Sequence, residues 1–194
     1  MSRLLKLAED CTHTRTIGMS IYPAGGDHLI AHGKLTDIRL KDYYKFTGER
    51  LNAGTLHDLE IVLLLKIPRL IIEDLEVIIK TVPREDCNLI EKTLDPIIGM
   101  SVTGGFSSKV REVAGGITGC THLVHLVNTM APAIIQGLWS YVFQNKPDVS
   151  KIKSGSGTDT LSRGLKDSCL TWREEGEAWQ KLSKFVKEKS SDGG

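Results

Sequence analysis

Apolar and polar residues alternate along the first half of the chain, which is the pattern of strands with one buried face. Within the first run, Ile17, Met19 and Ile21 fall on one face, and the turn-forming residues 23–27 follow it. The alternation predicts strands at residues 14–22, 29–40, 57–67 and 70–82. Because short connections join these runs, we expect a mostly antiparallel sheet of about four strands.

In the second half, the apolar residues recur with the period of an α-helix. The predicted helices cover residues 86–97, 107–114 and a long segment from Cys120 through Leu138. Asp86 is expected to cap the first helix, and Pro132 to kink the long one, because proline lacks the backbone N–H that a helix needs. Strands followed by helices predict the α+β class, with short helices and then a long helix after the sheet.

Three parts of the chain differ in pattern. Residues 12–144 hold the predicted α+β domain, and residues 145–160, which contain Lys-Pro-Asp and Ser-Gly-Ser-Gly, read as a flexible linker. Residues 161–190 predict an amphipathic C-terminal helix that carries Cys169, Trp172 and Trp179 on its apolar stripe. We expect this helix to serve as a contact surface, so a protein partner is one candidate function for it.

Charge and cysteine usage exclude several classes of protein. The 194 residues include 25 Lys+Arg and 24 Asp+Glu, and this balance argues against a general nucleic-acid binder. Four scattered cysteines are too few for a secreted disulfide framework. The chain starts without a signal-peptide pattern, and its most apolar stretch, residues 61–72, is interrupted by charged residues and proline. These features predict a cytoplasmic protein that neither spans membranes nor forms disulfides.

Potential metal ligands lie at the boundaries of the predicted elements. His57 and Asp58 open the third strand, Cys87 follows the fourth, and Cys120 and His122 begin the long helix. A thiol at a helix N-terminus is stabilised as the thiolate, and such donors together suffice for one four-coordinate ion. Spacing alone also fits the alternative that both cysteines are ordinary buried thiols and both histidines lie at the surface.

Three short strings carry a family resemblance: Leu56-His57-Asp58, Pro83 followed by Cys87, and Gly119-Cys120-Thr121-His122-Leu123. In this order they resemble a bacterial family known only as a domain of unknown function, over about residues 12–175. That family has no established activity, so the resemblance implies membership without a mechanism.

A more distant likeness joins residues 58–135 to iron–sulfur scaffold proteins of the NifU/IscU type. The corresponding strings are Leu56-His57-Asp58, Asp86-Cys87-Asn88 and Gly119-Cys120-Thr121-His122. The likeness implies that these three ligand groups meet at one end of the sheet. His57 stands where the scaffold has its first cysteine, and Gly119 stands where it has a histidine. Two thiolates instead of three suit zinc or a mononuclear iron better than cluster assembly.

The leading hypothesis is therefore a Zn or Fe site, related to iron–sulfur proteins, made by His57, Asp58, Cys87, Cys120 and His122. An enzyme is the first alternative, with Cys120 as the nucleophile, His57 or His122 as the base and Asp58 orienting it. In the second alternative, the protein is a non-catalytic interaction module that docks through its C-terminal helix. Substrate, pathway and oligomeric state stay open.

Overall fold

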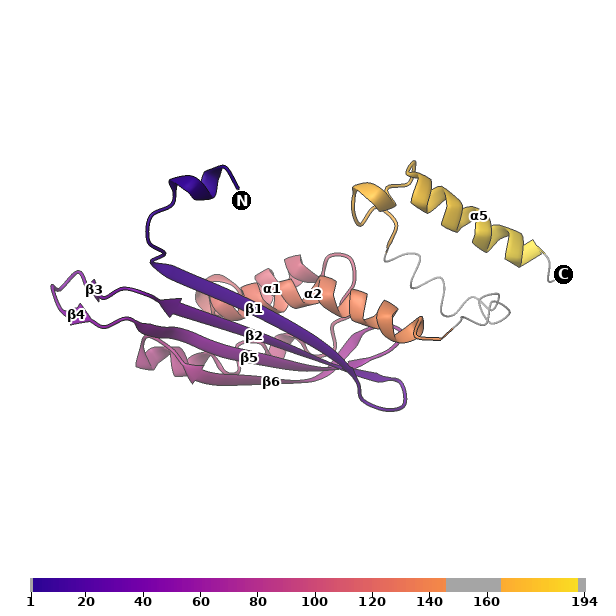
Figure 1. Cartoon of the computed structure of the whole chain (residues 1–194). Helices are drawn as coiled ribbons and strands as arrows, with labels where there is room; N and C mark the ends of the chain where they lie inside the picture. Colours follow the sequence, from indigo (N-terminus) through magenta and orange to yellow (C-terminus); the bar gives the residue numbers. More distant parts are fainter. Residues whose placement is uncertain (1, 146–164, 192–194) are drawn as a thin grey trace.

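The computed structural model describes residues 2–145 and 165–191, and it has the α+β class that the sequence predicts (Figure 1). The strands are β1 (His13–Pro23), β2 (His28–Arg39), β3 (Tyr43–Tyr44), β4 (Arg50–Leu51), β5 (Gly54–Lys66) and β6 (Ile71–Thr81). The α-helices are α1 (Phe106–Ala114), α2 (Thr121–Val142) and α5 (Glu177–Ser191). Short 3-10 helices are η1 (Leu4–Leu7), η2 (Glu85–Ile90), η3 (Asp95–Ile97), η4 (Gly116–Thr118) and η5 (Leu170–Trp172).

Four long strands form one antiparallel sheet in the order β1-β2-β5-β6. This is the four-stranded sheet expected from the alternation of apolar residues. The charged connection between β2 and β5 contains a separate two-stranded hairpin, β3–β4, which projects beyond the sheet (Figure 1). β2 and β5 therefore pair along their length although a hairpin separates them in sequence.

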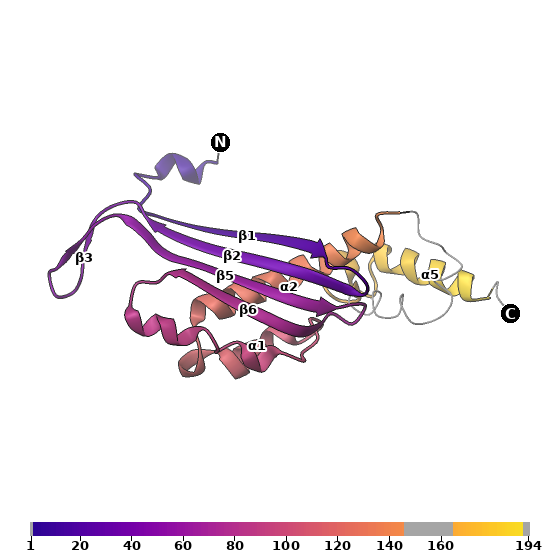
Figure 2. The ribbon, with the colours of Figure 1, turned by 90° about the horizontal axis from the view of Figure 1, so that it is seen from below.

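Helices α1 and α2 cover one face of the sheet, and the core lies between these two layers (Figures 1 and 2). The fully buried side chains of the strands include Leu29, Leu35, Leu59, Ile61, Leu63, Leu65 and Ile72. They meet the buried stripe of α2, which includes Leu123, Leu126, Val127, Met130 and Ile134. This burial removes apolar surface from water and is the main force that holds the helices on the sheet.

Two glycines let α2 approach the sheet closely. A Cβ atom at Gly33 of β2 would lie 2.5 Å from the Sδ atom of Met130. A Cβ atom at Gly137 of α2 would lie 2.5 Å from Cγ1 of Ile21 in β1. The absence of a side chain at both positions thus sets the distance between the helix and the first two strands.

The structure differs from the sequence-based prediction in two helical segments. The helix predicted at residues 86–97 is instead the pair η2 and η3, and Arg84 takes the N-cap position expected for Asp86. Pro96 explains part of this difference, because the residue before a proline avoids the α-helical conformation.

Within the described residues, no helix has the length and apolar character needed to cross a membrane.

The predicted C-terminal helix is shorter than expected at its N-terminal end. α5 begins at Glu177, directly after the buried Gly176, and Cys169 is an exposed thiol before η5 instead of a member of a helical stripe. The predicted linker lies outside the described residues apart from Asn145.

Candidate functional site

A row of three ionisable side chains crosses the helix-covered face of the sheet. Asp37 of β2 is the register partner of Arg15 in β1 and of His57 in β5. Arg15 donates from Nε and Nη2 to the two carboxylate oxygens of Asp37, both at 2.7 Å. Nδ1 of His57 lies 2.9 Å from Oδ2 of Asp37. Only 1% of Asp37 and 6% of His57 is exposed, so both belong to the buried layer between the sheet and the helices, whereas Arg15 on the edge strand is partly exposed.

The beginning of α2 brings two more candidate groups to this row. The ring of His122 packs on the ring of His57, with centroids 3.9 Å apart and an interplanar angle of 33°. Nε2 of His122 lies 4.0 Å from Oδ2 of Asp37, and its Nδ1 lies 3.9 Å from Sγ of Cys120. Cys120 occupies the N-cap position of α2 and is half-buried. The site is thus assembled from three strands and one helix N-terminus.

Arg15 keeps Asp37 ionised across the physiological pH range. Its hydrogen bonds to the carboxylate lower the pKa of Asp37 from 3.8 to about 2, against the opposing effect of burial. An ionised carboxylate only accepts hydrogen bonds, so the contact with Nδ1 of His57 requires the proton to sit on Nδ1. Nε2 of His57 is the ring nitrogen that Asp37 does not engage.

His122 is held in its neutral form. Burial lowers the pKa of His122, and the positive charges of His57 and Arg15 lower it further, while Asp37 opposes them. Two imidazolium rings at a centroid distance of 3.9 Å would repel each other, which disfavours protonation of both. At neutral pH His122 is therefore an uncharged imidazole, the form in which histidine binds metals.

One ligand atom each from Asp37, His57 and His122 lies within 4.8 Å of the others. The oxygens of Asp37 already receive two hydrogen bonds from Arg15 and one from His57, and Nε2 of His13 lies 3.4 Å from Oδ1. A carboxylate has about four lone-pair positions, so Asp37 is occupied as an acceptor. Its geometry is that of a group that orients His57, and the sulfur of Cys120 is the next donor beside His122.

Of the five residues singled out from the sequence, the structure brings His57 and His122 together and places Cys120 beside His122, although Cys120 is not part of the group of close ligand atoms. Asp58 lies on the opposite face of the sheet, because neighbouring residues in a strand point to opposite sides. There its Oδ1 is 3.1 Å from Nζ of Lys34. Cys87 is half-buried in η2, and it is not part of the group of close ligand atoms found among the described residues.

Sequence reasoning missed Asp37, Arg15 and His13. A detectable signal existed for Asp37, because it continues the period-two series of Leu29, Ala31, Gly33 and Leu35 on the apolar face of its strand. A carboxylate in such a series needs a buried partner. Its partners lie on other strands, where no local pattern in the sequence points to them.

A family model described as a protein of unknown function, DUF2889, matches residues 13–136. These residues include every strand of the four-stranded sheet and the whole row of Arg15, Asp37, His57 and His122. No curated protein and no solved structure gives a significant match to the chain. The likeness to NifU/IscU scaffold proteins thus stays a prediction.

Proposed function

The chain belongs to the DUF2889 family of proteins of unknown function, and we propose that it binds a single zinc ion through His57, His122 and Cys120. The observation that carries this proposal is the close pair of imidazole rings of His57 and His122, the first of which is held by Asp37 through Nδ1. Metal-binding histidines typically donate their second ring N–H to a carboxylate, which fixes the tautomer and the ring orientation. Asp37 and His57 have this relation.

The donor set favours zinc over harder or larger ions. Two imidazole nitrogens and a thiolate match the ligands that zinc takes, whereas magnesium and calcium require oxygen ligands. Bonds of about 2.0–2.1 Å from zinc to nitrogen place two ligand nitrogens about 3.3 Å apart in a tetrahedron. Sγ of Cys120 lies 3.9 Å from Nδ1 of His122, whereas the group of ligand atoms within 4.8 Å of one another consists of Asp37, His57 and His122, so binding through Cys120 requires its side chain to turn toward His57.

Charge balance supports a cation at this place. Arg15 pairs with Asp37 through two hydrogen bonds, so the negative charge that balances a zinc ion would come from the thiolate of Cys120. Three protein ligands leave the fourth position of a tetrahedral zinc ion open for water or a substrate, as in catalytic zinc sites. The proposed centre is therefore of the reactive type, with Asp37 and Arg15 as its supporting pair.

We expect the protein, expressed without a tag and purified without chelators, to contain about one equivalent of zinc. His57→Gln and His122→Gln should each lose most of the metal, because each removes one nitrogen ligand. Replacement of zinc by cobalt should give a thiolate-to-cobalt charge-transfer band that disappears in Cys120→Ser. Elemental analysis and absorption spectra provide the two measurements.

His125→Gln is the matched control, since His125 lies three residues after His122 on the same helix and is exposed. This variant should keep its zinc. Asp58→Asn and Cys87→Ser test the two other residues that the sequence suggested, and both should retain the metal as well. A purified protein without bound metal, which also fails to take up added zinc or cobalt, would contradict the proposal.

A second candidate function follows from the contact between Cys120 and His122. Sγ of Cys120, both nitrogens of His122 and Oδ2 of Asp37 form a chain with steps of 3.9 and 4.0 Å across the imidazole. A thiol, a base and a carboxylate in this order are the components of an activated cysteine nucleophile. In this case, the site would form a covalent intermediate at Cys120 without a metal ion.

Alkylation by iodoacetamide separates these two functions. If zinc binds, Cys120 should react slowly in the zinc-loaded protein and become reactive after chelation, as followed by mass spectrometry of its peptide. If Cys120 is a metal-free nucleophile, it should react faster than Cys11 with or without zinc, and His122→Gln should slow it. Cys11 is the suitable reference because backbone N–H groups of Trp172 and Thr171 lower the pKa of Cys169.

A further inference from the structure

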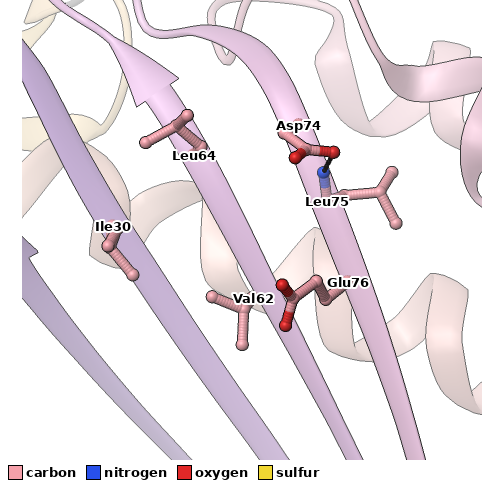
Figure 3. Close-up of a pocket in the computed structure, with 6 residues that line it drawn as sticks. All are labelled: Ile30, Val62, Leu64, Asp74, Leu75 and Glu76. Atoms are coloured by element: carbon pink, nitrogen blue, oxygen red, sulfur yellow. Dashed lines mark hydrogen bonds between the residues drawn. The ribbon is translucent and has the colours of Figure 1, made fainter.

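The face of the sheet that points away from α1 and α2 carries an apolar patch. Tyr22, Ile30 and Leu64 are register partners in one row across β1, β2 and β5, and Val62 follows on the same face of β5. Figure 3 shows Ile30, Val62 and Leu64 along the floor of a shallow pocket. Tyr22 is 50% exposed at the edge of this patch. No element among the described residues packs on these side chains as α2 packs on the core face.

Two carboxylates border the patch on its β6 side. Asp74 and Glu76 line the same pocket and are the register partners of Leu64 and Val62 (Figure 3). Asp74 accepts a hydrogen bond from the backbone N–H of Leu75, and neither carboxylate has an ion pair within the described part of the chain. The border of the patch thus offers negative charge to a cationic partner.

The next charges along the same face are already neutralised. Glu60 forms ion pairs with Lys80, His32 and Lys34, and Lys34 also pairs with Asp58. These partners leave little net attraction for another molecule at that end. The docking surface suggested by the chemistry is therefore the apolar patch of Tyr22, Ile30, Val62 and Leu64 with the border of Asp74 and Glu76.

Helix α5 has the complementary chemistry. Trp179, Leu182 and Phe185 follow each other at intervals of three residues, which places them on neighbouring positions of one helix face. Phe185 is 41% exposed, so part of this face is uncovered. The sequence of α5 contains Lys181, Lys184, Lys187 and Lys189 against Glu177 and Glu188. Lys181 and Glu177 form an ion pair with each other, and the helix as a whole carries a net positive charge.

The connection between α2 and α5 is long enough for α5 to reach this surface. Residues 165–176 of this connection are folded into η5 and hydrogen-bonded turns, which leaves the 19 residues 146–164 between the two described parts of the chain. Nineteen residues span at most about 60 Å, whereas a strand of the length of β2 spans about 40 Å.

We propose that α5 of the same chain docks on the open face of the sheet, with Trp179, Leu182 and Phe185 on the apolar patch and the net positive charge of the helix next to Asp74 and Glu76. In this arrangement, helices cover both faces of the sheet, and the C-terminal segment is an intramolecular partner of the domain. The docking surface lies on the face opposite to the candidate metal centre, so the proposal stands independently of zinc binding.

Photo-crosslinking in the full-length chain tests this docking. Tyr22 is replaced by the photoreactive residue benzoylphenylalanine, which is close to tyrosine in shape, and a second protein carries it at Leu64. Irradiation should give crosslinks to peptides from residues 177–191 in monomeric protein, identified by mass spectrometry. The same probe at Glu112, an exposed residue of α1 on the other side of the molecule, should not crosslink to α5.

Charge reversal provides the second measurement. Asp74→Lys combined with Glu76→Lys should lower the yield of the α5 crosslink by about fivefold, the factor expected for the loss of two exposed ion pairs. Glu112→Lys should leave the yield unchanged, and circular dichroism shows that each variant is folded. Crosslinks to α5 that occur only in dimeric protein would assign the surface to a second copy. Dimer-only crosslinks, or the absence of any crosslink to α5, overturn the proposal.

Discussion

Gly137→Ala is expected to lower the free energy of unfolding by about 2–3 kcal/mol. The added methyl group would lie 2.5–2.7 Å from three side-chain atoms of Ile21, which is closer than carbon atoms can approach. Ile21 is branched at Cβ and rotates poorly out of the way, so the helix itself has to move from the sheet. In an unconstrained helix, replacing glycine by alanine stabilises the helix by about 1 kcal/mol. A loss of stability would therefore indicate the collision with Ile21. Urea unfolding followed by circular dichroism measures it.

Two further variants identify the contact as the cause. Gly18→Ala on the same strand as Ile21 meets no atom within 4 Å, so it should change stability little. Ile21→Ala should destabilise the protein by itself but should reverse part of the additional loss caused by Gly137→Ala, because it removes the colliding Cγ1 and Cγ2 and keeps only Cβ, 2.7 Å from the added methyl group. Equal or greater stability of Gly137→Ala would show that α2 does not pack this closely on β1.

Asp37→Asn is expected to lower the free energy of unfolding at neutral pH by about 3 kcal/mol. The amide keeps the shape of the carboxylate, but its NH₂ group faces donors of Arg15 instead of accepting from them. The positive charge of Arg15 then loses its buried partner, and the proton on Nδ1 of His57 is left with a weaker acceptor. Chemical denaturation at pH 7 measures the loss, and Asp10→Asn serves as an exposed control.

The dependence on pH gives this variant its specific signature. The pKa of Asp37 is about 2 in the folded protein against 3.8 ordinarily, so its contribution is complete above pH 4 and is lost as the pH falls toward 2. The pKa of Glu60 is also lowered to about 2, chiefly by Lys80, so the variant itself still loses stability in acid. The difference between wild type and Asp37→Asn should therefore shrink by about 2 kcal/mol between pH 5 and pH 2. A difference that stays constant would contradict the proposed role of the charge.

The order of the elements could be predicted because it rests on local patterns. Alternation along residues 57–67 is visible within the segment itself, and the stripe of α2 repeats every three or four residues. Both features arise from burial of one face, which any single element has to achieve. The helix expected at residues 86–97 lacked such a strong pattern, and the proline within it favoured short 3-10 turns.

The composition of the site could be predicted only in part. His57 lies near the start of β5, and Cys120 and His122 lie at the start of α2. At these positions polar residues interrupt an apolar pattern, which the sequence shows directly. Asp37 was hidden because its function depends on Arg15 and His57, which are about twenty residues away in either direction. Asp58 was predicted as a ligand because it follows His57 directly, but neighbouring residues of a strand point to opposite faces of the sheet. Asp58, which follows His57 directly in sequence, therefore lies away from the site, whereas Asp37, 20 residues before His57, contacts it.

The row of Arg15, Asp37 and His57 also has a consequence for how the sheet assembles. If β2 paired one residue out of step, Asp37 would turn to the open face, while Arg15 and His57 would be left facing the core without a carboxylate between them. A mispaired sheet would thus leave the buried His57 without its acceptor and the partly exposed Arg15 without its counter-ion, at a cost of about 1–3 kcal/mol. The contacts of Asp37 with Arg15 and His57 form only when β1, β2 and β5 pair in the correct register. The side chains around the candidate centre therefore also stabilise this register during folding.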